Sequence, residues 1–440
     1  MRHAELTRVA VLSVLIVACS GRSDRSTREG TPVAEHPTSR AQYALSYQPG
    51  DEDSDLVIRR AQEGAADSPD DVDVYVRLAR GFLRKRRETA DPVFLAYARD
   101  AIAAAQQISP RDANVMALDI VALFNGHEFR TASDRATQLI SIAPDDPTGY
   151  LLLGDALLEL GKYETAIDAY QNAMDRHPDL RSYSRAAYVR WLYGDYEGSL
   201  ELWEDALQSA SAGDPEPAAW CYAELGAVLL SRGNAKAALR SADRADKLVA
   251  GYLPALVLRG RALARLGRTD EAITALEAAV ARQPNAETLL LLSELSGTAG
   301  HVADARRHRG RAARLADHDP LPVALHYARH GIEVERAVAL AGQAIEDRRS
   351  VWAYDALALA QLRTGDVASA SQSIRKAMSL GTPQAELYLH YGLIEAAAGN
   401  PDAARHALAT ALEIDPTADP LVVTELRGQL NNTIAMEASR

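Results

Sequence analysis

The side chains that could hold a metal ion or carry out catalysis are few in this sequence. His326 and His330 lie four residues apart, about one helical turn, so their imidazoles could share a metal ion. A third ligand would have to come from elsewhere, with Glu333 and His301 as the candidates. Two surface histidines explain the same spacing, so we expect no metal site and no cofactor.

The common enzyme motifs are also missing. The sequence has no phosphate-binding P-loop, no dinucleotide-binding glycine motif, no nucleophile elbow, no HExxH zinc motif and no paired CxxC. His127 and Glu128 begin like the zinc motif, but its second histidine is missing. Cys221 has no activating cluster beside it and is interpreted as a packing residue. We therefore expect no catalytic activity. The enzymatic alternative is a metal-dependent hydrolase built on His326 and His330.

The helices that would position any binding residues follow one pattern, which is clearest between residues 150 and 178. Leu153 and Leu157 lie one turn apart on a first helix, and Gly161 allows the chain to reverse. The stripe on the second helix consists of Ala166, Tyr170 and Ala173. Small residues in both helices let the backbones approach closely. Such a hairpin cannot bury its apolar face alone and implies neighbouring hairpins.

This order of large, small, turn, small and large residues resembles the tetratricopeptide repeat. Later turn glycines are separated by 39, 34 and 33 residues, and they are Gly194, Gly233, Gly267 and Gly300. The resemblance implies an all-α, right-handed superhelical solenoid of about eight to ten helix-turn-helix hairpins. The unit at 320–347 opens with Pro320 and Pro322, so we expect an irregularity there.

The N-terminus is typical of a signal peptide. Its apolar run, residues 9–18, is too short to cross a bilayer core of about 30 Å as a helix. Residues 16–19 resemble the bacterial lipobox, which implies a lipid on Cys19 as the first mature residue. Ser20 follows, and the resemblance then implies an outer-membrane lipoprotein facing the periplasm of the bacterial cell envelope. An ordinary secretory signal and an uncleaved anchor are the alternatives.

The sequence divides into five segments on these grounds. They are a lipoprotein signal peptide (1–18), an acylated cysteine with a disordered linker (19–50), an N-terminal cap with a degenerate first repeat (51–111), the tetratricopeptide repeat array (112–416), and a C-terminal capping helix and tail (417–440). Two basic clusters stand out. We expect residues 84–87 on a loop-like insertion and residues 306–311 on a second helix.

The net charge limits the classes of partner. The chain carries a formal net charge of −12, and removal of residues 1–18, with a net charge of +1, would leave −13. Such an excess of negative charge argues against general nucleic-acid binding.

The resemblance also suggests where a partner would bind. A tetratricopeptide superhelix generally presents the first helix of each hairpin along a concave groove. The implied groove residues are Arg181, Arg185, Tyr188, Trp191, Trp220, Arg261 and Arg265, followed further on by His326, Arg329, Trp352 and Arg363. Arginine forks suit carboxylates, and aromatic faces suit apolar side chains or sugar rings. A chance mixture on a solvated face is the alternative.

We therefore expect a non-catalytic adaptor or scaffold, anchored to a membrane through Cys19, that holds a protein partner in this groove. The alternative is a glycan-binding component of an envelope export or cell-wall system, suggested by Trp191 and Trp220 beside Arg185 and Arg261.

Overall fold

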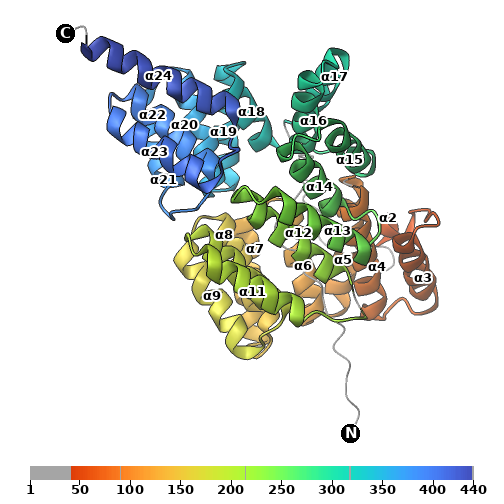
Figure 1. Cartoon of the computed structure of the whole chain (residues 1–440). Helices are drawn as coiled ribbons and strands as arrows, with labels where there is room; N and C mark the ends of the chain where they lie inside the picture. The colour runs from red at the N-terminus through yellow and green to blue at the C-terminus, as the bar shows by residue number, and fades with distance from the viewer. Residues whose placement is uncertain (1–40, 90, 214, 317–318, 439–440) are drawn as a thin grey trace. The chain divides into compact units, whose positions relative to one another are not determined.

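The computed structural model describes residues 41–89, 91–213, 215–316 and 319–438 (Figure 1). The expected signal peptide and Cys19 lie outside the described residues. Within those residues the regular structure consists of 23 helices and no strand. The all-α prediction is confirmed.

The first twelve helices are α2 (Gln42–Leu45), α3 (Asp53–Asp67), α4 (Val72–Thr89), α5 (Val93–Ile108), α6 (Ala113–Asn125), α7 (Phe129–Ile142), α8 (Pro147–Glu159), α9 (Tyr163–Arg176), α10 (Leu180–Leu192), α11 (Tyr196–Gln208), α12 (Glu216–Ser231) and α13 (Ala235–Leu248). The remaining helices are α14 (Leu253–Arg265), α15 (Thr269–Arg282), α16 (Ala286–Thr298), α17 (Val302–Ala313), α18 (Pro320–His330), α19 (Val334–Asp347), α20 (Val351–Arg363), α21 (Val367–Ala377), α22 (Ala385–Ala397), α23 (Pro401–Ile414) and α24 (Pro420–Ala438).

Consecutive helices pair into antiparallel hairpins from α4/α5 to α22/α23, which makes ten hairpins in the described part of the chain (Figure 1). The predicted turn glycines 194, 233, 267 and 300 all have positive φ angles, between 72° and 84°. Glycine adopts this left-handed conformation without the strain that a Cβ atom would cause. The structure is an α-solenoid of helical repeats, as the sequence predicts.

Close approach of the two helices defines the hairpin α8/α9. Gly154 on α8 faces the ring of Tyr170 on α9, and a Cβ atom at Gly154 would overlap that ring. The Tyr170 hydroxyl donates to Oδ1 of Asp155 at 2.9 Å, which fixes the ring over the glycine. Ala166 and Ala173 are fully buried beside it. Gly154, Ala166 and Ala173 therefore lie at the contact between the two helices, as the sequence pattern predicts.

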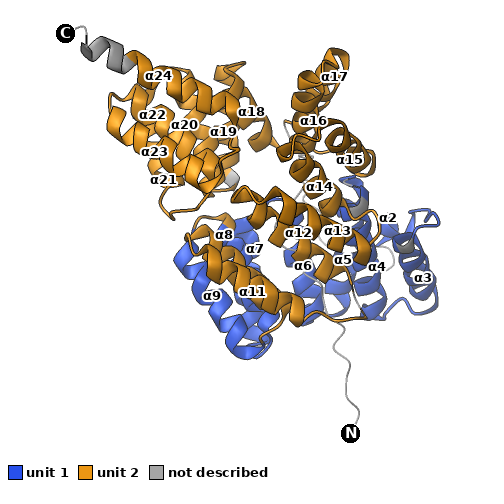
Figure 2. Ribbon diagram, viewed as in Figure 1, with its two compact units in different colours: residues 1–158, 162–177 blue, residues 159–161, 178–440 orange. Residues whose placement is uncertain are grey.

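The chain divides into two compact units (Figure 2). Unit 1 comprises residues 1–158 and 162–177, and unit 2 comprises residues 159–161 and 178–440. One apolar core of unit 1 joins α2 to α6, and the largest core of unit 2 joins α15 to α24. The boundary between the two units falls inside the expected repeat array, 112–416.

The expected loop-like insertion at residues 84–87 is wrong. These residues form the last turns of α4, which continues to Thr89. Lys85 is buried, and its Nζ lies 2.9 Å from Glu52 and 2.5 Å from Asp55. Burial opposes the charge of Lys85, but the hydrogen bonds to these carboxylates raise its pKa. Ion pairing to the segment around α3 thus keeps a basic run helical.

The degenerate unit is a complete hairpin with a shorter first helix. Helix α18 has 11 residues, whereas α16 and α20 have 13. Gly331 ends α18 in the left-handed conformation, and Glu333 also has a positive φ, of 48°. A non-glycine residue in that region is uncommon and indicates a locally strained turn.

Of the helices that the structure describes, none is both long enough and apolar enough to span a membrane.

The close approach in α8/α9 can be tested with two glycines that differ only in their surroundings. Gly154→Ala should reduce the free energy of unfolding by about 1 to 3 kcal/mol relative to Gly342→Ala, because only the first new methyl group meets a fixed side chain. Gly342 is also helical, but a Cβ atom there would meet nothing within 4 Å. Urea unfolding followed by circular dichroism measures the difference. Equal unfolding midpoints would show that Tyr170 can move away freely.

Candidate functional site

The first helices of the hairpins form the inner layer of unit 2. Within the described residues, the first helices of several neighbouring hairpins pack against each other. Examples are α12 against α14 and α18 against α20. Second helices of neighbouring hairpins have far fewer contacts. A row of helices that touch on one side and diverge on the other curves toward the touching side. We call the exposed surface of first helices α10 to α22 the inner face.

Three of the seven predicted groove residues are buried in unit 2. Arg185, Trp191 and Trp220 are only 4%, 7% and 7% exposed. Trp191 stacks on Trp352 with ring centroids 5.8 Å apart, and Trp220 meets Trp203 edge to face at 5.7 Å. In this structure these aromatic rings join helices of unit 2 to one another.

The other four predicted residues are partly exposed on first helices. Tyr188 and Arg181 lie on α10, and Nε of Arg181 is 2.9 Å from Oδ2 of Asp179, its own N-cap residue. On α14, Arg261 pairs with Glu287 of α16, and 38% of its side chain is exposed. Arg265 lies 2.8 Å from Glu386 and also pairs with Asp415.

Arginines further along the inner layer are paired with the C-terminal part of unit 2. Nε of Arg329 on α18 donates a hydrogen bond to Oδ2 of Asp419 at 2.9 Å. Arg363 on α20 donates through Nη2 to Glu425 of α24 at 2.8 Å. With Arg265 this makes three arginines on three first helices that bind carboxylates of the same chain. The inner layer can recognise carboxylates, and its C-terminal half already does so internally.

Ionisable side chains form a row across α12, α14 and α16. Glu224 on α12 is close enough to Arg261 on α14 for the guanidinium charge to act on its carboxyl group. Arg261 in turn forms an ion pair with Glu287 on α16. Burial raises the pKa of Glu224 to about 8, although the positive charge of Arg261 opposes this shift. Glu224 is therefore largely protonated at neutral pH.

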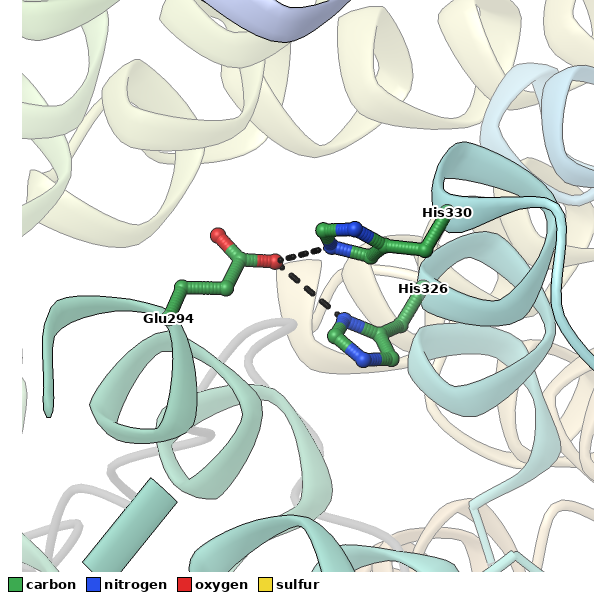
Figure 3. A group of neighbouring side chains, drawn as sticks. All are labelled: Glu294, His326 and His330. Atoms are coloured by element: carbon green, nitrogen blue, oxygen red, sulfur yellow. Dashed lines mark hydrogen bonds and ion pairs between the residues drawn. The ribbon is translucent and has the colours of Figure 1, made fainter. Parts of the chain in front are cut away.

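His326 and His330 come together with a residue that the sequence analysis did not select. Oε1 of Glu294 on α16 lies 3.2 Å from Nδ1 of His326 and 3.2 Å from Nε2 of His330 (Figure 3). Burial disfavours ionisation of Glu294, but hydrogen bonds with both histidines and the charge of Arg329 hold the pKa of Glu294 well below its usual range. His326 is buried and His330 is exposed.

The two candidates proposed as a third ligand lie elsewhere in the fold. His301 and Glu333 are the N-cap residues of α17 and α19, and neither belongs to the group around Glu294. Glu294 precedes His326 by 32 residues, nearly one repeat, and lies on the preceding first helix. A search for acidic residues on the preceding first helix would have found it.

Cys221 is fully buried in a cluster with Trp203 and Ala187. Burial raises the pKa of its thiol, which disfavours the reactive thiolate. The interpretation of Cys221 as a packing residue is confirmed.

Comparison with known families decides the type of repeat. One family model of the tetratricopeptide repeat matches residues 121–181, 151–217 and 356–419, and a second matches residues 253–295. The chain contains tetratricopeptide repeats. Tetratricopeptide repeats mediate protein–protein interactions, and their stacked hairpins form extended concave binding surfaces.

Several solved tetratricopeptide-like structures are similar to this chain in fold. Pseudomonas aeruginosa PilF is 16% identical over 47% of this chain and 94% of its own, with a TM-score of 0.39. Yeast Tom70 is 13% identical over 91% of this chain and 97% of its own, with a TM-score of 0.39. The human IFIT1 dimer with PPP-AAAA is 15% identical over 87% of this chain and 95% of its own, with a TM-score of 0.47. No curated protein sequence matches significantly.

The protonation of Glu224 predicts how the stability of the tetratricopeptide array depends on pH. A free glutamate ionises near about pH 4.3, whereas the pKa of Glu224 in the fold is about 8. Between these values the unfolded chain binds fewer protons than the folded chain, so the free energy of unfolding falls as pH rises.

Glu224→Gln removes this dependence. The variant should therefore melt at a higher temperature than the wild type at pH 8 and at the same temperature near pH 4.5, as measured by thermal unfolding in matched buffers. A difference between the two proteins that is the same at both pH values would contradict the assignment.

Proposed function

We propose that this protein is a non-catalytic adaptor or scaffold of the bacterial cell envelope. It is anchored by a lipid on Cys19 to a membrane, the outer membrane facing the periplasm, and holds a partner protein on the inner face of unit 2. The observation that carries the proposal is the exposed ion pair of Arg261 on α14 with Glu287 on α16, together with the partly exposed Arg181 and Tyr188 on α10.

The pairing state of the arginines indicates which part of the inner face is available. Arg329 and Arg363 each bind a carboxylate that is at most 28% exposed. The pair of Arg261 and Glu287 is different, because the two side chains are 38% and 50% exposed. Exposed ion pairs contribute only about 0 to 1 kcal/mol. A carboxylate of a partner can therefore displace Glu287 at little cost.

The chemistry of the partner follows from the side chains that face it. The guanidinium of Arg261 presents a planar fork that matches a carboxylate, and Tyr188 adds an apolar ring with a polar hydroxyl. A protein segment with acidic and apolar side chains fits this combination. We place its binding surface on α10, α12, α14 and α16.

The anchor supplies the second part of the mechanism. A single acyl chain gives only reversible attachment, whereas two or three hold a protein stably at the membrane. Attachment raises the effective concentration of the adaptor near any partner in the same membrane. A low affinity of the inner face for its partner is then sufficient to keep much of the adaptor bound.

The glycan alternative gains no support from the structure. It depends on sugar rings stacking on Trp191 and Trp220, and both indoles are buried against other tryptophans. We therefore do not carry it further.

The binding surface is tested by affinity purification of the acylated full-length protein from detergent-solubilised envelopes. Arg181→Ala combined with Arg261→Ala should lose the partners that the wild type retains. The matched control is Arg306→Ala with Arg309→Ala, which removes two exposed charges from the second helix α17. Equal recovery with the inner-face variant and the wild type would contradict the proposed surface, and loss only with the control variant would place binding on the outer layer.

The anchor has its own test. Cys19→Ala removes the acceptor of the lipid, so the protein should move from the membrane fraction to the soluble fraction on cell fractionation. Ser20→Ala serves as the control, because it changes the neighbouring side chain and leaves the acceptor in place. Membrane retention of the Cys19→Ala protein would contradict lipid anchoring.

A further inference from the structure

We infer that Glu294, His326 and His330 form a binding site for a divalent transition-metal ion such as Zn²⁺. This site is separate from the binding surface proposed above and does not depend on it. It would join two neighbouring hairpins, since Glu294 belongs to α16 and both histidines belong to α18.

The donor atoms are the right kind and converge on one point. Two imidazole nitrogens and one carboxylate oxygen are common zinc ligands. Each nitrogen lies 3.2 Å from Oε1 of Glu294, and one ligand atom from each residue lies within 4.8 Å of the others. With zinc–ligand bonds of about 2.0 to 2.1 Å, ligands at two corners of a tetrahedron are about 3.3 Å apart. Both distances to the carboxylate oxygen are therefore close to those of a tetrahedral ion, and the two nitrogens lie within 4.8 Å of each other.

The backbone holds the three side chains toward one another. His326 and His330 are one turn apart on α18 and extend from the same side of the helix, and Glu294 reaches them from α16 (Figure 3). His326 is buried, which limits its motion, whereas His330 is exposed and gives an ion access from solvent. A water molecule can fill the fourth coordination position.

Arg329 is the positive group that an ion would have to tolerate. Its Nη1 lies 3.4 Å from Oε1 of Glu294. The same guanidinium donates through Nε and Nη2 to Oδ2 of Asp419, whose negative charge compensates it. The two carboxylates together balance Arg329 and leave a net negative charge for a cation.

The group has two forms with the same framework. Without an ion, ring N–H groups of the histidines donate to the carboxylate of Glu294. With an ion, Nδ1 of His326 and Nε2 of His330 coordinate through their lone pairs, and each neutral ring keeps its proton on the other nitrogen. Little movement separates the two forms, so binding requires no rebuilding of the fold.

The location gives the ion a structural consequence. The site joins α16 to α18, a short first helix that opens with Pro320 and Pro322. A coordinated ion would fasten α16 to α18 and stiffen the inner layer of unit 2 where these two first helices meet.

The test uses the full-length protein, purified without a polyhistidine tag and freed of metal with a chelator. Titration with Zn²⁺ by isothermal calorimetry should show one site, and Co²⁺ should give the visible absorption of a tetrahedral complex. Glu294→Gln and His330→Ala should each weaken Zn²⁺ binding by about tenfold or more. Circular dichroism confirms that both variants are folded.

His301→Ala is the matched control, because this exposed histidine lies on the same stretch of chain but outside the group. It should bind Zn²⁺ as tightly as the wild type. Absence of Zn²⁺ binding by the wild type would overturn the inference and leave a purely hydrogen-bonded cluster. Binding that is unchanged in both Glu294→Gln and His330→Ala would also overturn it, because the ion would then lie elsewhere.

Discussion

Within each unit, the structure depends on the close approach of helices at glycines on the first helices of hairpins. At Gly154, Gly226, Gly260 and Gly392 a Cβ atom would overlap a side chain from a neighbouring helix. The partners are Tyr170, Leu258, Leu276 and Leu426. Each of these large side chains therefore lies directly on the backbone of a first helix. This contact sets the distance between helices, and repeated along the chain it generates the inner layer on which the candidate sites lie.

Electrostatics adds a second constraint to this packing. The chain is acidic overall, yet arginines are placed on first helices of unit 2 and meet carboxylates from other helices. Arg265 pairs with Asp415, which is 150 residues further along the chain. Partly buried ion pairs contribute little net stability because desolvation opposes them, but an unpaired buried charge is strongly unfavourable. The pairs therefore favour one arrangement of the C-terminal helices over others.

The local part of this fold could be predicted from the sequence. The spacing of Gly194, Gly233 and Gly267 marks the turns, and the small residues beside Tyr170 mark the close contact, because both requirements arise within one hairpin. The helix through residues 84–87 was missed because its stability depends on buried Lys85 pairing with Glu52 and Asp55.

Contacts between repeats were less accessible to sequence reasoning. Glu294 was missed although it lies almost one repeat before His326, because adjacent first helices meet only through the stacking of whole hairpins. The stacking of Trp191 on Trp352 joins residues that are several repeats apart. Such a contact depends on the sum of small rotations from each repeat, which no local pattern records.

The inner face of α10 to α16 is the surface on which we propose that a partner protein lies. Site-specific photo-cross-linking in intact cells tests it most directly, with a photoreactive amino acid at position 261 of α14 or at position 309 of α17. We expect a cross-linked protein adduct from position 261 and none from position 309. An adduct from position 309 alone would contradict it and would place the partner on the outer layer.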